Sequence, residues 1–62
     1  MKKSIYNIIV NYKEHYLIYN ALKASCVILK KDEYEAFDSF TCLGQEEKEY
    51  IRLGLYVEDD DN

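Results

Sequence analysis

The stretch Tyr16-Leu-Ile-Tyr-Asn-Ala-Leu-Lys-Ala-Ser-Cys-Val-Ile-Leu29 decides the fold. It holds two apolar runs, at residues 16–19 and 24–29, separated by a short break. Tyrosine, isoleucine and valine favour a pleated, half-buried surface, so each run predicts a strand. Asn20 suits the break, because its side chain can hydrogen-bond to nearby backbone in a turn. The stretch therefore predicts a β-hairpin around which the rest of the chain is arranged.

A further strand is expected before this hairpin, at residues 5–12. Tyr6, Ile8, Val10 and Tyr12 alternate with the residues between them, which predicts a strand with one drier face. The three polar residues that follow have the right length for a hairpin loop. The sequence therefore predicts a three-stranded antiparallel meander, about the minimum for a stable sheet once a helix covers one face.

Two helices are expected after the meander of residues 5–29, near residues 33–41 and 45–53. The glycine that follows the second helix fits the left-handed position at which many helices end. Strands followed by helices predict an α+β fold. A chain of 62 residues holds one domain at most, here residues 1–57, followed by an acidic tail or the beginning of a linker at 58–62.

The first helix carries the clearest local signals. Asp32 is expected to cap its first free amides, with Glu35 three residues later in the capping-box position. Tyr34, Phe37 and Phe40 recur at helical spacing. We therefore expect Phe37 and Phe40 to be buried against the sheet.

Composition argues against several classes of protein. The formal charge of −4 disfavours nucleic acid as the main partner, because duplex binding needs a basic face. No apolar run approaches the roughly 20 residues that span a bilayer. The Met-Lys-Lys start resembles the first part of a signal peptide, but Asn7 interrupts the apolar run after it. We therefore expect a cytoplasmic protein with no membrane partner.

The residues that carry catalysis or bind metals are sparse. His15, the single histidine, falls in an expected hairpin turn, where a solvated role is the simplest interpretation. Cys26 and Cys42 are too few for a disulfide framework, and their spacing fits no zinc motif. The acidic tail lacks the alternating ligands and central glycine of a calcium loop. The sequence predicts no catalytic residues, no metal site and no cofactor, and therefore no enzyme.

The edge of the predicted sheet gives the strongest indication of function. In the expected meander the third strand is an edge, and its apolar Val27, Ile28 and Leu29 would promote aggregation unless something covers them. One use of such an edge is to accept a peptide as an additional strand. The alternative, which the residues leave open, is that the last segment of the chain or a neighbouring copy covers the edge.

Two short motifs resemble a known family. They are Tyr-Asn-Ala-Leu at residues 19–22, and Gly-Leu-Tyr-Val at 54–57 before an acidic run at 58–61. With the order of the elements, they resemble the N-terminal peptide-recognition element of radical S-adenosylmethionine maturases of ribosomally made peptides. That element is a small winged helix-turn-helix, similar to the pyrroloquinoline-quinone peptide chaperone. In that family the leader of a precursor peptide adds as a strand beside the third strand, in a groove walled by a helix.

The resemblance implies that this chain binds a leader peptide and presents it to a catalytic radical S-adenosylmethionine domain or protein. The family usually has three helices after its sheet, whereas the sequence predicts two here. The Cys-x3-Cys-x2-Cys motif that holds the iron–sulfur cluster is absent, so the chain is expected to be non-catalytic, as a domain of such an enzyme or as an accessory to it. The other function kept open is that of a small winged-helix DNA-binding or regulatory protein.

The expected peptide-binding residues follow from the edge and the resemblance together. The third strand would pair with the leader, and Lys30 and Lys31 would steer an acidic leader. Two residues of the second helix would wall the groove. The expected site is Cys26, Val27, Ile28, Leu29 and Lys30 on the strand, with Tyr50 and Leu53 on the helix.

Overall fold

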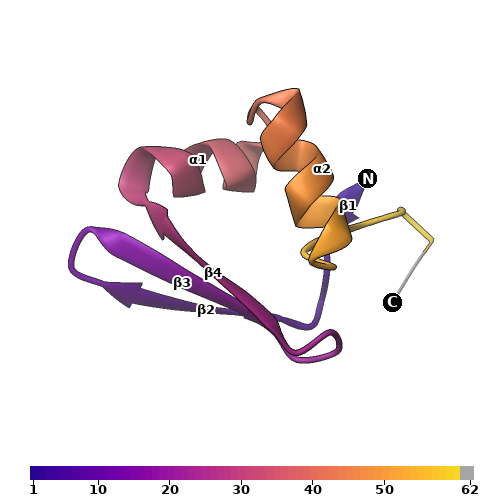
Figure 1. Cartoon of the computed structure of the whole chain (residues 1–62), viewed down its shortest axis with the longest axis horizontal. Helices are drawn as coiled ribbons and strands as arrows, with labels where there is room; N and C mark the ends of the chain where they lie inside the picture. Colours follow the sequence, from indigo (N-terminus) through magenta and orange to yellow (C-terminus); the bar gives the residue numbers. More distant parts are fainter. Residues whose placement is uncertain (61–62) are drawn as a thin grey trace.

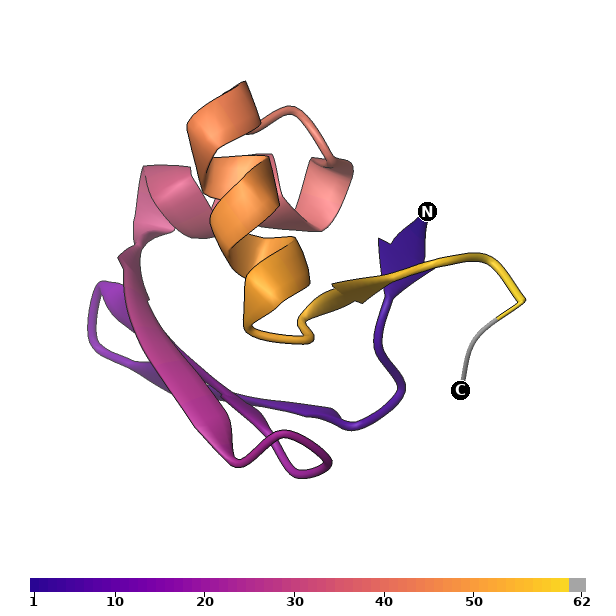
Figure 2. The same ribbon diagram turned by 45° about the vertical axis from the view of Figure 1, so that its right-hand side comes forward.

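The computed structural model describes residues 1–60 and has an α+β fold, as the sequence predicts (Figure 1). A three-stranded antiparallel sheet is followed by two helices, and both helices lie on the same face of the sheet (Figures 1 and 2). The elements in chain order are β1 (Lys2–Lys3), β2 (Asn7–Tyr12), β3 (His15–Asn20), β4 (Ser25–Lys30), α1 (Lys31–Ser39), α2 (Gly44–Arg52) and β5 (Tyr56–Val57).

The three-stranded sheet has the order β2-β3-β4, which confirms the predicted meander. The register places Ile18 at its centre, opposite Ile9 of β2 and Val27 of β4. The two turns use left-handed backbone at Lys13, with φ 57°, and at Ala24, with φ 54°. Because the register brings Ile18 beneath the helices, its side chain is fully buried.

A small second sheet, which the sequence did not indicate, joins the two ends of the chain. Strand β1 pairs antiparallel with β5, with Lys2 opposite Val57 and Lys3 opposite Tyr56. Next to this pair, the Ser4 amide donates to Leu55 O at 2.9 Å. Two-residue strands have no alternation long enough to predict them, and their partners lie more than 50 residues away.

An aromatic cluster holds the helices to the sheet. The Phe37 ring stacks on Tyr56 and meets Tyr50 edge-on, with ring centroids 5.0 Å apart in both pairs. The Tyr56 hydroxyl donates a hydrogen bond to Phe37 O at 2.6 Å, which satisfies its polar end inside the core. The buried hydrophobic side chains are Ile18, Leu29, Phe37, Tyr50, Leu55 and Tyr56.

Two predictions about α1 are wrong. The helix begins at Lys31, directly after β4, so Glu33 and not Asp32 or Glu35 forms the cap: Glu33 Oε1 accepts from the Lys30 amide at 2.8 Å. Phe37 is fully buried as predicted, but Phe40 is 42% exposed. Phe40 adopts a left-handed backbone conformation, with φ 60°, and ends the helix. Its ring therefore does not follow the helical spacing that would have buried it against the sheet.

The prediction of one drier face on the first strand is also wrong. Helix α1 packs on β3 and β4, while β2 lies beyond the cover of the helices. As a result Ile8, Ile9 and Val10 are 52%, 42% and 49% exposed, although Ile9 and its two neighbours point to opposite faces. An alternating pattern indicates a strand, but it does not reveal whether another element covers either face.

The buried tyrosines make the fold sensitive to high pH. Burial, with a smaller effect of Glu46, raises the pKa of Tyr50 from 10.0 to about 12, and burial likewise raises the pKa of Tyr56. Above pH 10 the unfolded chain therefore loses tyrosine protons that the folded chain retains. We expect the free energy of unfolding to be unaffected by these groups below pH 10 and to fall as the pH rises towards 12.

Urea unfolding at a series of alkaline pH values measures this effect. The Tyr50→Phe variant should lose part of the pH dependence, because it removes one of the three tyrosine hydroxyl groups whose pKa is raised, those of Tyr34, Tyr50 and Tyr56. An equally steep decline in Tyr50→Phe would contradict the assignment to Tyr50.

Candidate functional site

At each edge of the sheet, every second residue directs its backbone amide and carbonyl away from the neighbouring strand. In β2 these residues follow from the register with β3. The Ala21 amide donates to Tyr6 O at 3.0 Å, and the register of β2 and β3 extends to this pair. Tyr6 and every second residue after it therefore direct their backbone groups towards β3. Asn7, Ile9 and Asn11 direct theirs outwards, away from the sheet.

The same alternation passes through β3 and fixes the outward groups of β4. By the register of β3 and β4, Cys26, Ile28 and Lys30 direct their amides and carbonyls away from β3. The Lys30 amide already donates to Glu33. Among residues 1–60, no backbone hydrogen bond joins the outward groups of Cys26 and Ile28 to another segment. These two of the predicted site residues therefore carry the open part of the edge.

The side chains of the five predicted β4 residues divide between the two faces of the sheet. Ile28 is 66% exposed, and Cys26 and Lys30 are also exposed, all on the face away from the helices. Val27 is half-buried and Leu29 is buried, both on the helix-covered face. A bound strand at this edge would thus border a solvent-exposed apolar face on one side and the core on the other.

The two predicted wall residues of the second helix have different surroundings. Tyr50 is only 4% exposed, and its ring packs between Phe37 and Tyr56, so little of it is left to contact a peptide. Leu53 is half-buried and packs against the same core. Helical periodicity identifies the apolar side of α2 correctly: Tyr50 packs on Phe37 of α1 and Tyr56 of β5. The end of the helix also meets the start of β4, where the Ser25 hydroxyl donates to Leu53 O at 2.6 Å.

A hollow of about 410 Å³ lies where β4 ends and α1 begins. Lys30 and Lys31 line it, together with Glu14, His15 and Asp32. His15 is the cross-strand partner of Lys30, so the β2–β3 turn and the β4–α1 junction meet here. Glu14, His15 and Asp32 are not among the residues predicted for the site, although pairing the two predicted strands could have brought His15 close to Lys30.

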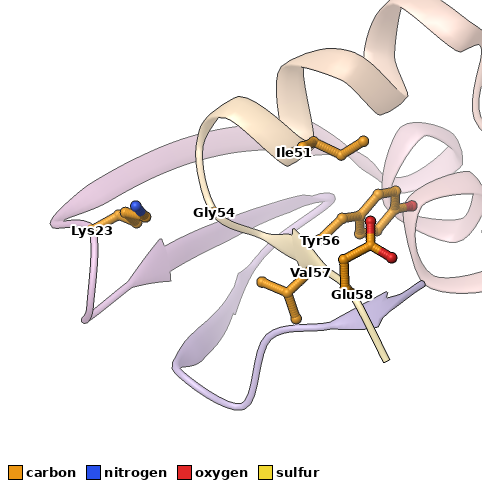
Figure 3. A pocket seen from close by; sticks show the side chains of 6 residues that line it. All are labelled: Lys23, Ile51, Gly54, Tyr56, Val57 and Glu58. Atoms are coloured by element: carbon orange, nitrogen blue, oxygen red, sulfur yellow. The ribbon is translucent and has the colours of Figure 1, made fainter. Parts of the chain in front are cut away.

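A second, smaller hollow lies at the other end of the molecule (Figure 3). Its volume is about 230 Å³, below the range of about 300–1,000 Å³ that is typical of ligand pockets. Gly54 forms part of its wall with φ +81°, the left-handed conformation that the sequence predicts there. A Cβ at this position would lie 2.5 Å from Lys23 Cγ, so a side chain larger than hydrogen would push Lys23 aside.

Other kinds of site find little support in the described part of the chain. Residues 1–60 contain no group of three or more histidine, cysteine, aspartate or glutamate side chains that could hold a metal ion. Cys26 and Cys42 are both free thiols. No helix within the described range is long and apolar enough to cross a membrane.

Comparison of the chain with protein-family models, with curated proteins and with solved structures gave no match.

Proposed function

We propose that this chain binds the leader segment of a ribosomally made precursor peptide, which adds as an antiparallel strand beside β4. The observation that most supports this proposal is that the outward amides and carbonyls of Cys26 and Ile28 have no backbone partner among residues 1–60. Their two amides and two carbonyls offer four hydrogen bonds to an extended peptide. Backbone pairing of this kind gives affinity with little demand on the sequence of the peptide.

Selectivity would come from side chains at the two ends of the bound strand. In the hollow, Lys30 and Lys31 would pair with an acidic side chain of the leader, and Glu14 and Asp32 with a basic one, although exposed charge pairs contribute only about 0–1 kcal/mol each. Alternate leader side chains would lie next to Ile28 on the open face of the sheet. Tyr50 is assigned no contact with the peptide, because its ring is in the core.

The chain acts in this proposal as a binding module in the cytoplasm, where it presents the leader to a radical S-adenosylmethionine enzyme that modifies the rest of the peptide. A DNA-binding role finds less support, because the second helix of a helix-turn-helix has to approach phosphates. Helix α2 has three glutamates against Lys48 and Arg52, so it offers no excess of positive charge to a phosphate backbone.

Ile28→Pro is the sharpest test of binding at β4. Proline removes the outward amide of Ile28 and leaves the amides that bond to β3 in place, as is tolerated on an edge strand. We expect its affinity for the leader encoded by a neighbouring short reading frame to fall at least about tenfold, the effect of one to two lost hydrogen bonds and a steric clash. Isothermal titration calorimetry measures the change.

Asn11→Pro is the matched control, because it removes an outward amide from the opposite edge of the sheet. It should bind the leader as the unaltered protein does. In an amide NMR titration the largest shifts should fall on residues 26–31. Shifts confined to residues 7–12 would move the site to β2, and an absence of binding would overturn the proposal.

A further inference from the structure

Strand β2 lacks the features that protect edge strands. Asn7–Tyr12 contains no charged residue and no proline, and three of its apolar side chains are about half exposed: Ile8, Ile9 and Val10. Edge strands are usually protected by lysine, proline, a bulge or a covering segment. On the face away from the helices, Ile8 and Val10 continue into exposed Tyr19 and Ile28, and apolar surface that is continuous in this way can mark an interaction site.

The sequence of β2 is nearly the same read in either direction. Asn7-Ile8-Ile9-Val10-Asn11 is symmetric about Ile9, apart from the exchange of isoleucine for valine. If two such strands pair antiparallel about a two-fold axis at Ile9, Ile9 faces its own copy, Ile8 faces Val10 and Asn7 faces Asn11. Directly opposed residues point to the same face of a sheet, so like side chains meet on both faces.

The backbone groups of β2 that point away from the sheet are the ones that this pairing requires. Ile9 and Asn11 direct their amides and carbonyls outwards, and neither has an outward backbone partner among residues 1–60. With the axis at Ile9, the two Ile9 residues exchange amide-to-carbonyl bonds, and each Asn11 amide reaches the Asn7 carbonyl of the other copy. The Asn7 amide is already engaged with Ser4 O, at 3.3 Å. Four intermolecular hydrogen bonds result.

We propose that two copies of this chain pair through β2 to form one continuous six-stranded antiparallel sheet. The occupant is a second copy, because the near-symmetry about Ile9 places like side chains opposite each other across a two-fold axis. Charge supports the same occupant: the chain carries a net −4, with acidic residues on α2 and at residues 58–60, whereas β2 is uncharged, so the pairing places no like charges face to face. The β4 edge stays free in the dimer.

Sedimentation velocity of the full chain, without any peptide, tests the dimer. The weight-average mass should rise with protein concentration from 7.4 kDa towards twice that value. Asn11→Pro removes two of the four intermolecular hydrogen bonds and should raise the dissociation constant at least about tenfold. Ile28→Pro, the same change on the β4 edge, should leave the dissociation constant unchanged.

Amide hydrogen exchange gives a second measurement. Protection of Ile9 and Asn11 should grow with protein concentration, while that of Ile8 and Val10, whose amides bond within the sheet, should not. If Asn11→Pro fails to fold, Val10→Lys replaces it, because it places a charge opposite Ile8 of the other copy. A monomer at every concentration, or equal weakening by Ile28→Pro, overturns the dimer and leaves the leader-binding proposal untouched.

Discussion

Replacing Phe37 with alanine should remove at least about a third of the free energy of unfolding. Phe37 is fully buried and touches Tyr34, Tyr50 and Tyr56 through its ring. Removing so large a buried ring costs about 3–5 kcal/mol, through lost burial and the cavity left behind. A 62-residue domain has a free energy of unfolding of only about 3–9 kcal/mol in total, so the change removes much of it.

Phe40→Ala is the matched control in the same helix. The Phe40 ring also meets Tyr56, but it is 42% exposed at the end of α1, so its loss should cost less than that of Phe37, about 1–2 kcal/mol. Urea unfolding followed by circular dichroism measures both variants. If Phe37→Ala and Phe40→Ala had the same midpoint, the aromatic cluster would not be the core that the structure describes.

The second large effect is expected from Asn20→Ala. Asn20 is 1% exposed, and its side chain joins three segments: its amide donates to Asn7 Oδ1 and to Gly54 O, and its carbonyl accepts from the Lys23 amide. Alanine leaves these partners unsatisfied in a water-poor site. We expect a loss of about 2–4 kcal/mol in the free energy of unfolding, the cost of orphaning several partly buried polar groups.

Asn11→Ala makes the same chemical change at an exposed position of the sheet, and it should alter the free energy of unfolding by less than about 0.5 kcal/mol. The comparison therefore separates the hydrogen bonds of Asn20 from the intrinsic strand preference of asparagine. A loss at Asn20 as small as that at Asn11 would mean that these bonds add nothing to stability.

Asn20 also shows how far local sequence patterns reach. A bond from its side chain to nearby turn backbone is predicted, and the Lys23 amide makes that bond at 2.8 Å. Its other two bonds go to Asn7 Oδ1 and to Gly54 O, and the second of these spans 34 residues and depends on where α2 ends in space. The three strands and two helices follow from alternation, helical spacing and turn residues, all of which act over a few positions.

What packs against each element could not be predicted in the same way. The side of α2 that carries Tyr50 is apolar, as expected, but only the structure shows that α1 and β5 cover it. That the amides and carbonyls of Cys26 and Ile28 point outwards depends on which residues of each strand are hydrogen-bonded to the next strand, across all three strands. A sequence specifies which strands are edges once their order is known, but not which of their amides remain unpaired.

The pairing of β1 with β5 has a consequence for the synthesis of the protein. Lys2–Lys3 is synthesised well before Tyr56–Val57, because the sheet, both helices and their connections lie between them in the sequence. Two of the six buried hydrophobic residues, Leu55 and Tyr56, belong to this late segment. Contacts between such distant parts of a chain are slow to form, because a large loop must close first. A nascent chain from which residues 55–57 have not yet emerged therefore lacks part of the core, and we expect the domain to fold only after they have left the ribosome.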